Sequence, residues 1–194
     1  MSCRVVDVMR CFIAIDMPEN IKDAIAGFIE KCGPNSKGLR WVPAENVHLT
    51  LKFLGDVKED LIPEIEKRLL LICMRIDVFN INIRGAGAFP NFKYPNVLWI
   101  GIDESEELRK LYEDIEESMS DLGFEKEDRK FSPHLTIGRV KDRKGTEPVI
   151  KGLYAFKDTF WGSIEVNEVL LMQSILKTTG AEYSKIAGFK LFKG

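Results

Sequence analysis

The sequence predicts an α+β protein with two lobes, in which two duplicated strand-helix-strand units and mostly antiparallel sheets surround a central cleft. Two observations lead to this prediction. The tripeptide His-Leu-Thr occurs twice, at 48–50 and 134–136, and it holds both histidines of the 194-residue chain. Each copy also follows a short apolar strand and an amphipathic helix at nearly the same distance, which indicates an internal duplication.

The first elements of the two copies match in type and order. FIAID (12–16) and WIGID (99–103) are short apolar strands that end in aspartate. Apolar residues then recur at helical spacing over 21–32 and over 108–122, which predicts a helix with one buried face in each copy. His48 follows Asp16 by 32 positions and His134 follows Asp103 by 31. The two histidines therefore lie on equivalent strands, predicted at 47–55 and 133–140.

Other elements surround these two units. The pattern predicts a helix over 61–76, a half-buried strand over 79–85, one long strand over 164–176 and a final strand over 183–191. No stretch rich in Pro, Gly or Ser separates the halves. We therefore expect a single bilobal domain over 1–194, with the duplication in roughly 10–55 and 97–140.

Composition limits the possible classes of protein. With 45% hydrophobic and 30% charged residues, the chain has the makeup of an ordinary folded domain. Its formal net charge of −2 gives no general basic field, so any contact with nucleic acid must rely on local basic residues. The four cysteines match neither a zinc site nor a disulfide framework and are interpreted as buried or incidental thiols. Without a good signal peptide or a membrane-length apolar run, we expect a cytoplasmic protein.

The repeated tripeptide places chemistry on one face of each strand. Side chains alternate along a strand, so His48 and Thr50 project together, as do His134 and Thr136, while the leucines between them face the other way. If the two lobes face each other about a pseudo-twofold axis, two imidazoles and two hydroxyls converge across a cleft. Such a pair suits displacement at phosphorus, with one histidine activating water and the other protonating the leaving oxygen. The threonine hydroxyls can bind the non-bridging oxygens.

The same alternation predicts which neighbouring residues share the face of the histidines. Lys52 shares the face of His48 and could add positive charge, whereas Phe53 shares the side of the leucines, which favours the core. Arg139 lies an odd number of residues from His134, so it reaches the phosphate only if the strand twists, bulges or ends near Gly138. The basic segment 141–145 could meet an RNA backbone, although a plain surface loop is the simpler interpretation.

Two other interpretations of the histidines are weaker. A histidine on an amphipathic strand is usually structural, but a purely structural role does not explain why both histidines recur in register with a threonine. A catalytic zinc usually takes three protein ligands, and neither strand has Asp, Glu or Cys at ligand spacing. We therefore expect no metal and no cofactor.

At these two strands the sequence resembles the 2H phosphoesterases, a family defined by a pair of His-x-Thr motifs. It is most similar to the 2′-5′ RNA ligase-like branch, also described as RNA 2′,3′-cyclic phosphodiesterases. The resemblance covers nearly the whole chain and includes RCFIAID, RWVPAENVHLTLKFLG, FSPHLTIGR and SILKTTGAEYSKI.

The resemblance implies a bilobal α+β fold and hydrolysis of a 2′,3′-cyclic phosphate to a 2′-phosphate without metal or cofactor. It implies that His48 donates a proton to the leaving 3′-oxygen and that His134 activates water. By the same resemblance Thr50, Thr136 and Arg139 bind phosphate, and the partners are RNA ends or nucleoside 2′,3′-cyclic phosphates. We expect a monomer that does not bind membranes. Two alternatives stay open, a 2′-5′ RNA ligase that uses the same site and a non-catalytic protein that binds RNA ends.

Overall fold

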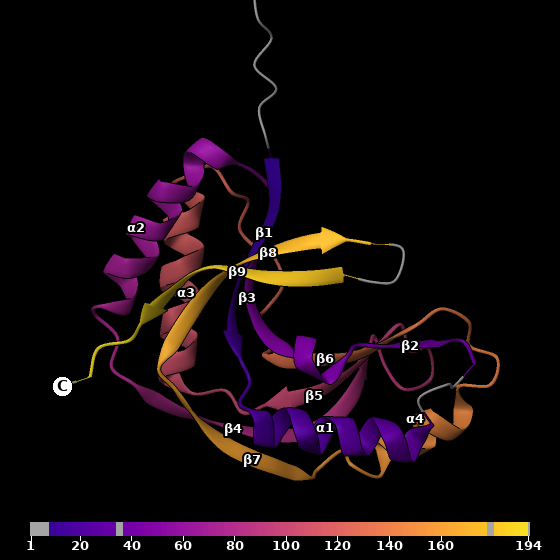
Figure 1. Ribbon diagram of the computed structural model, residues 1–194. Coiled ribbons are helices and arrows are strands. Elements are labelled where there is room, and N and C mark those ends of the chain that lie inside the picture. The colour runs from indigo at the N-terminus through magenta and orange to yellow at the C-terminus, as the bar shows by residue number, and fades with distance from the viewer. Residues whose placement is uncertain (1–7, 34–36, 178–180, 194) are drawn as a thin grey trace, which may run out of the picture.

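The computed structural model describes residues 8–33, 37–177 and 181–193, whose strands form one curled sheet (Figure 1). Neighbouring strands pair antiparallel throughout. In chain order the strands are β1 (Val8–Asp16), β2 (Leu39–Trp41), β3 (His48–Lys58), β4 (Phe79–Phe89), β5 (Val97–Ile102), β6 (His134–Val140), β7 (Phe160–Val166), β8 (Glu168–Leu176) and β9 (Ala181–Lys190).

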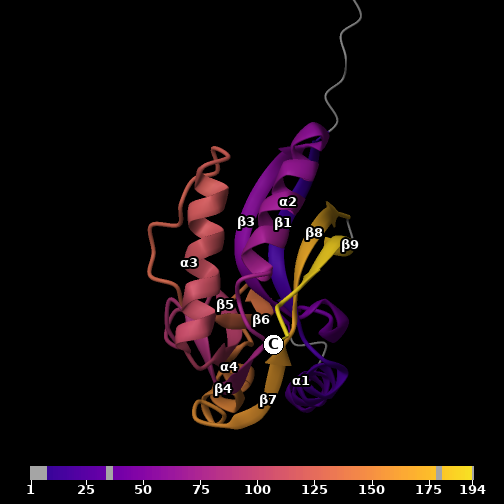
Figure 2. The same ribbon diagram turned by 90° about the vertical axis from the view of Figure 1, so that its left-hand side faces the viewer.

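Four helices cover the sheet in two pairs. They are α1 (Glu19–Cys32), α2 (Ile62–Cys73), α3 (Glu106–Ser120) and α4 (Glu147–Tyr154). Helices α2 and α3 pack side by side against one half of the molecule, and α1 and α4 lie together at the other half (Figures 1 and 2). Each helix buries one apolar face, as its helical spacing of apolar residues predicts.

The strand order shows where the two copies meet. The order is β7-β4-β5-β6-β3-β1-β8-β9, with β2 paired to β6. The two His-Leu-Thr strands, β3 and β6, are neighbours at the centre, and their registered pair joins Leu49 to Leu135, the equivalent leucines of the two tripeptides. We call β3, β1, β8 and β9 the first lobe and β6, β5, β4 and β7 the second lobe. The predicted fold class, α+β with two antiparallel lobes, is confirmed.

Each copy of the duplication divides its elements between the lobes. Helix α1 follows β1 of the first lobe but packs on the second, where the Phe28 ring meets Phe156 and Trp161 at 5.0 and 5.8 Å. Helix α3 follows β5 of the second lobe but packs on β3 of the first. An amphipathic pattern says that a helix covers a sheet but not which sheet, so the sequence could not predict this exchange.

Three local predictions were wrong or incomplete. The single strand expected over 164–176 is two strands, since β7 pairs with β4 and β8 pairs with β1 at opposite sides of the sheet. The chain changes direction at Asn167, a residue type that favours turns. The alternation of buried Ile164 and Val166 before it gives way to three consecutive buried residues, 169–171, after it. Strand β2 and helix α4 were not predicted at all.

The copies also differ in the register of their first strands. In the first lobe Asp16 lies opposite His48, whereas in the second lobe Gly101 lies opposite His134. Asp103, which the sequence comparison aligned with Asp16, therefore lies two residues beyond the histidine and pairs with Arg84 at 3.3 Å instead. Only the first histidine has a carboxylate at the facing position.

Candidate active site

Both His-x-Thr pairs occupy one face of the sheet at its centre. Leu49 and Leu135 are fully buried on the opposite face, so the residues on either side of each leucine must point away from that core. Because the leucines are paired across antiparallel strands, His48 lies toward Thr136 and His134 toward Thr50. The structure thus brings together the four residues that the repeat predicted.

The two imidazole rings are held by the same type of bond. His48 Nδ1 lies 2.8 Å from the carbonyl oxygen of Asn46, and His134 Nδ1 lies 2.7 Å from the carbonyl oxygen of Ser132. A carbonyl only accepts hydrogen bonds, so Nδ1 must carry the proton and donate it in both rings. Each Nε2 is therefore left to accept a proton when the ring is neutral or to donate one when it is charged.

Aromatic side chains fix the ring orientations. The Phe12 ring stacks on His48 at 4.8 Å, and Tyr183 of β9 meets the edge of the same ring at 5.2 Å. On the other strand Phe89 contacts His134 edge-on at 5.0 Å. These contacts remove water from the rings and limit their rotation, which keeps each Nε2 in place.

The two rings share burial and a backbone hydrogen bond but differ in the charged groups near them. Burial is the largest effect and lowers the pKa of both histidines, while the backbone hydrogen bond raises each pKa. For His48 the Asp16 carboxylate raises the pKa further, and Lys22 lowers it. For His134 the nearby charge is Arg139, which lowers the pKa. A carboxylate therefore acts on His48 and a guanidinium on His134, while burial lowers the pKa of both rings.

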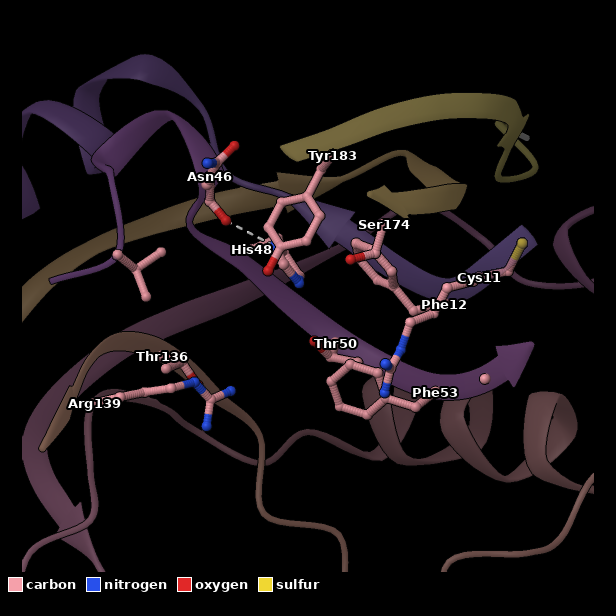
Figure 3. Close-up of a pocket in the computed structure, with 13 residues that line it drawn as sticks. Cys11, Phe12, Asn46, His48, Thr50, Phe53, Thr136, Arg139, Ser174 and Tyr183 are labelled. Atoms are coloured by element: carbon pink, nitrogen blue, oxygen red, sulfur yellow. Dashed lines mark hydrogen bonds between the residues drawn. The ribbon is translucent and has the colours of Figure 1, made fainter. Parts of the chain in front are cut away.

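A pocket of about 180 Å³ lies over this face (Figure 3). His48, Thr50, Thr136 and Arg139 line it, whereas His134, two residues before Thr136 on β6, is not among the lining residues. Sequence reasoning missed several of the other lining groups, which come from distant strands: Arg10, Phe12, Ser174 and Tyr183. Their positions depend on which strands become neighbours, and the sequence alone does not give that information.

A β-bulge in β6 decides the orientation of Arg139. Opposite β5, Leu98 pairs with Gly138 and Trp99 with Thr136, so Ile137 is an extra residue in β6. Alternation restarts after the bulge, and Arg139 returns to the face of Thr136. The sequence analysis allowed this outcome if the strand bulged near Gly138, and the bulge is there. Glycine fits at this point because a Cβ on residue 138 would lie 3.2 Å from the Trp41 ring.

The equivalent bulge in β3 overturns the expectations for Lys52 and Phe53. Opposite β1, Ile13 pairs with Lys52 and Ala14 with Thr50, so Leu51 is the extra residue. Lys52 is consequently turned to the helix side and is only 4% exposed. Phe53, expected in the core, is 72% exposed and lines the pocket. Strict alternation from His48 gave the wrong face for both residues.

Lys52 serves the structure on the far side of the sheet. Its Nζ donates to both carboxylate oxygens of Glu116 on α3 at 2.8 Å and to the carbonyl oxygen of Glu125 at 2.8 Å. All three donors of the ammonium are used, which a buried charge requires. The bond fixes α3 to β3 and contributes nothing directly to the pocket.

Within residues 8–33, 37–177 and 181–193, no group of three or more His, Cys, Asp or Glu side chains is placed to hold a metal ion. No helix in these same ranges combines the length and apolar character of a membrane span. Cys11 and Cys73 are buried, and burial raises their pKa values to about 11 and about 12. Cys3 lies outside the described residues.

Comparison with known proteins agrees with this geometry. A model of the 2′-5′ RNA ligase superfamily matches residues 21–176, which include both His-x-Thr strands and most of the residues that line the pocket. The chain belongs to that superfamily. The expected resemblance to the 2H phosphoesterases, to which this superfamily corresponds, is therefore confirmed.

Two relatives named as RNA 2′,3′-cyclic phosphodiesterases match almost the whole chain. An RNA 2′,3′-cyclic phosphodiesterase of Methanocaldococcus jannaschii is 40% identical over 178 residues, covering 92% of this chain and 98% of the relative. One of Archaeoglobus fulgidus is 37% identical and covers 94% of this chain and 100% of the relative.

Solved structures extend the similarity to the fold. The protein TT0787 of Thermus thermophilus has a TM-score of 0.81 at 27% identity, covering 94% of this chain and 98% of that one. Escherichia coli LigT complexed with 3′-AMP has a TM-score of 0.76 at 28% identity, covering 96% of this chain and 100% of that one.

Proposed function

We propose that the protein is an RNA 2′,3′-cyclic phosphodiesterase, which hydrolyses a terminal 2′,3′-cyclic phosphate to a 2′-phosphate. The observation that carries this proposal is the pair of histidines at the centre of the sheet. Both rings donate from Nδ1 to a backbone carbonyl and keep Nε2 for catalysis, yet a carboxylate affects one and a guanidinium affects the other. Two histidines with the same backbone hydrogen bond can thus supply an acid and a base for one turnover.

In the proposed mechanism the two rings act on opposite sides of the phosphorus. His134, kept neutral beside Arg139, accepts a proton at Nε2 from the attacking water as the water oxygen bonds to phosphorus. The bond from phosphorus to the 3′-oxygen breaks, and His48 donates its Nε2 proton to that oxygen. The product carries a 2′-phosphate and a 3′-hydroxyl, and the two protons balance across the turnover.

The other pocket residues suit the two parts of such a substrate. Thr50 and Thr136 present hydroxyls to the non-bridging oxygens, and Arg139 offers a guanidinium that can form paired bonds to phosphate. Phe53, Phe12 and Tyr183 form an aromatic wall on the other side of the pocket, which fits a nucleoside better than a bare sugar phosphate.

A 2′-5′ RNA ligase activity is the second candidate, and the superfamily match supports it. A 5′-hydroxyl of a second RNA would replace water at the same position, and the same two histidines would move the same two protons. The products would be a 2′-5′ linkage and a free 3′-hydroxyl. A protein that only binds RNA ends is the third candidate, and it would make no use of the acid and base pair.

Hydrolysis of a nucleoside 2′,3′-cyclic phosphate, with end-group analysis of the product, tests this proposal. We expect a 2′-phosphate product, and we expect the rate to be unchanged by a chelator because the residues supply both proton transfers. A 3′-phosphate product would contradict the proposed donor and acceptor. Activity lost in chelator and restored by one metal would replace the two-histidine mechanism with metal-activated water. If no cyclic phosphate is turned over, the result would support the third candidate, a protein that binds RNA ends without catalysis.

Two further predictions concern the organisation of the chain. We infer that residues 1–194 form one bilobal domain derived from duplication, and the exchange of helices between the lobes supports this. We also infer that the protein acts as a monomer, because one chain supplies every residue of the proposed site. Light scattering coupled to gel filtration measures the oligomeric state. The expected cytoplasmic location stays a prediction.

A further inference from the structure

A surface outside the pocket combines exposed aromatic rings with positive charge. We name it the aromatic-basic surface and define it by Lys93, Tyr94, Lys141, Arg143 and Lys144. We propose that it binds the nucleotides that precede the cyclic phosphate in an RNA strand, so that the preferred substrate is an oligonucleotide rather than a mononucleotide. This inference rests on the proposed function, because it extends the substrate of the same site.

The surface begins where the pocket ends. Arg139 lines the pocket and pairs with Val97, which is three residues after Tyr94 and belongs to the next strand. The loop that follows Arg139 is tied to its neighbours by backbone bonds, from Val140 to Asn96 at 2.9 Å and from Lys141 to Gly38 at 2.7 Å. Figure 1 shows this loop, in orange, at the same end of the sheet as β2. Chain length and strand spacing therefore put the Cα atoms of Tyr94 and Arg143 within about 16 Å of the Cα atom of Arg139.

The charge of this surface differs in sign from the charge of the chain. Together, residues 93–96 and 139–144 hold five cations and the single carboxylate of Asp142, while the whole chain has a net charge of −2. Asp142 accepts a hydrogen bond from the Lys144 backbone at 3.0 Å. In the part of the chain that the structure describes, no carboxylate forms an ion pair with the five residues of the aromatic-basic surface. These cations are left to attract phosphates.

The Tyr94 ring has the exposure and the support that base stacking needs. It is 47% exposed, and Lys93 Nζ and Arg143 Cζ lie over it, each 5.2 Å from its centroid, so a base would stack on the ring by displacing one of these side chains toward the phosphates. The loop is fixed by Asn91, whose Oδ1 accepts from the backbone of Lys93 at 3.0 Å and of Tyr94 at 2.9 Å. A ring that stacks a base beside cations that contact phosphate is the arrangement with which proteins bind single-stranded RNA.

A second ring continues the surface onto α4. Tyr154 is 52% exposed, contacts Phe92 of the same loop at 5.2 Å, and has Lys157 Nζ at 5.0 Å from its centroid. Two exposed tyrosines, each accompanied by a cation, are thus linked through the loop that carries Phe92 and Tyr94, and of these cations Lys157 also pairs with Asp158 at 3.9 Å. Successive rings are expected where successive bases of a strand are bound.

A similar pair elsewhere on the protein provides a matched control. Arg84 lies over the exposed ring of Phe160, with its Cζ at 5.2 Å from the centroid, the same distance as in the Arg143 and Tyr94 pair. That pair joins β4 to the edge strand β7, and Asp103 neutralises Arg84 at 3.3 Å. Like Arg143 and Tyr94, the pair Arg84 and Phe160 combines a cation with an exposed ring. Its cation is paired with a carboxylate, however, and the pair does not lie beside the pocket.

The test compares hydrolysis of a nucleoside 2′,3′-cyclic phosphate with that of a tetranucleotide ending in the same group. In the unsubstituted protein we expect kcat/KM to rise about tenfold or more with length, because additional bases stack. Tyr94→Ala and Arg143→Ala should abolish that rise and leave hydrolysis of the mononucleotide unchanged. Tyr94→Phe should keep it, as should the control variants Phe160→Ala and Arg84→Ala.

Two results would overturn the inference: a kcat/KM that does not depend on length, or a length effect that survives both Tyr94→Ala and Arg143→Ala. A second measurement separates this failure from failure of the proposed function. Fluorescence anisotropy with a labelled tetranucleotide ending in a 2′-phosphate needs no turnover. If no cyclic phosphate is hydrolysed, the proposed function is wrong, and loss of tetranucleotide affinity in Tyr94→Ala still decides whether this surface binds RNA.

Discussion

The two His-Leu-Thr strands share a backbone frame but differ in the side chains around it. In both, the histidine bonds to the carbonyl two residues earlier, the leucine is buried, and a bulge follows the threonine. Because the bulges are equivalent, the third residue after each threonine returns to the pocket face, as Phe53 in β3 and as Arg139 in β6. One strand therefore gives the pocket an aromatic ring, and the other gives it a cation.

The difference shows how a duplicated frame acquires two separate roles. Two identical histidines with identical neighbours would share one pKa, and no arrangement of charge would distinguish acid from base. Here Asp16 faces only His48 and Arg139 follows only His134, so the charge differs while the geometry is repeated. The predictions below test whether the repeated strands supply the geometry of the site and whether Asp16 and Arg139 determine which histidine is the acid and which is the base.

The largest effect should come from the element that the strands share. His48→Ala and His134→Ala should each lower kcat on a cyclic phosphate by about 10²–10⁴-fold, since each removes one proton transfer. The fold should survive, because neither ring belongs to the buried core. Steady-state kinetics with circular dichroism as a control measures both. Normal turnover in either variant would refute the two-histidine mechanism.

Lys52 and Gly138, each of which follows the extra residue of its bulge, are equivalent positions, and only Lys52 carries a charge. Lys52→Ala should lower the free energy of unfolding by about 3–5 kcal/mol, because the Glu116 carboxylate is left buried without its partner. Urea denaturation measures the loss. The double variant Lys52→Met/Glu116→Leu removes both charges and should regain most of the stability. An unaffected Lys52→Ala would mean that this ion pair is not buried in solution.

Phe53 and Arg139 occupy equivalent positions in β3 and β6, and we expect Phe53 to contact the base and Arg139 to contact the phosphate. Arg139→Ala should lower kcat/KM by about 100-fold or more on any cyclic phosphate, since two charged hydrogen bonds of roughly 1.5–3 kcal/mol each are lost. Phe53→Ala should raise KM only when the substrate carries a base. Ribose 2′,3′-cyclic phosphate, which has no base, is the matched substrate. Equal effects of Phe53→Ala on both substrates would show that the ring does not contact the base.

Smaller effects are expected at the threonines, which supply one hydrogen bond each. Thr50→Val and Thr136→Val keep the shape of the side chain and should lower kcat by about tenfold, the value of one hydrogen bond to a charged oxygen. Thr50→Ser and Thr136→Ser retain the hydroxyl and should stay near the original rate. If valine and serine variants behave alike, the threonines pack in the pocket without binding phosphate.

The sequence predicts the face of a side chain correctly only where the strand alternates regularly. The pairing of His48 with Thr50 and of His134 with Thr136 needs only the period of a strand, and both pairs lie on one face as predicted. Beyond Thr50 the bulge resets the period, so Lys52 and Phe53 were assigned to the wrong faces. A bulge depends on the partner strand, and neither Leu51 nor Ile137 signals it. For Arg139, alternation required a twist, a bulge or a strand end near Gly138, and the resemblance to a known family favoured its place at the phosphate.

Contacts between distant segments could not be predicted from the sequence, because they depend on which strands become neighbours. Tyr183 of β9 reaches His48 only because β8 and β9 join the first lobe after the chain has built the second. The aromatic-basic surface was visible in part, since the basic segment 141–145 was noted as a possible RNA contact. The ring of Tyr94 that completes it lies on another loop, and its nearness to Arg143 is a property of the fold alone.

The smallest effect is a shift in pH dependence, and it tests the assignment of roles most directly. If His134 is the base and His48 the acid, kcat/KM falls at low pH as His134 becomes protonated and at high pH as His48 loses its proton. Burial lowers the pKa of both rings, Asp16 raises that of His48, and Arg139 lowers that of His134.

Asp16→Asn removes the carboxylate that raises the pKa of His48, so the high-pH limb should move to lower pH while the low-pH limb stays. Arg139→Gln removes a charge that lowers the pKa of His134, so the low-pH limb should move to higher pH. The two apparent values belong to the coupled pair, and for that reason the direction of each shift is the quantity to compare. Profiles of kcat/KM from pH 5 to 9 for the three proteins measure both limbs. A shift of the low-pH limb in Asp16→Asn would contradict the assignment of His48 as the acid.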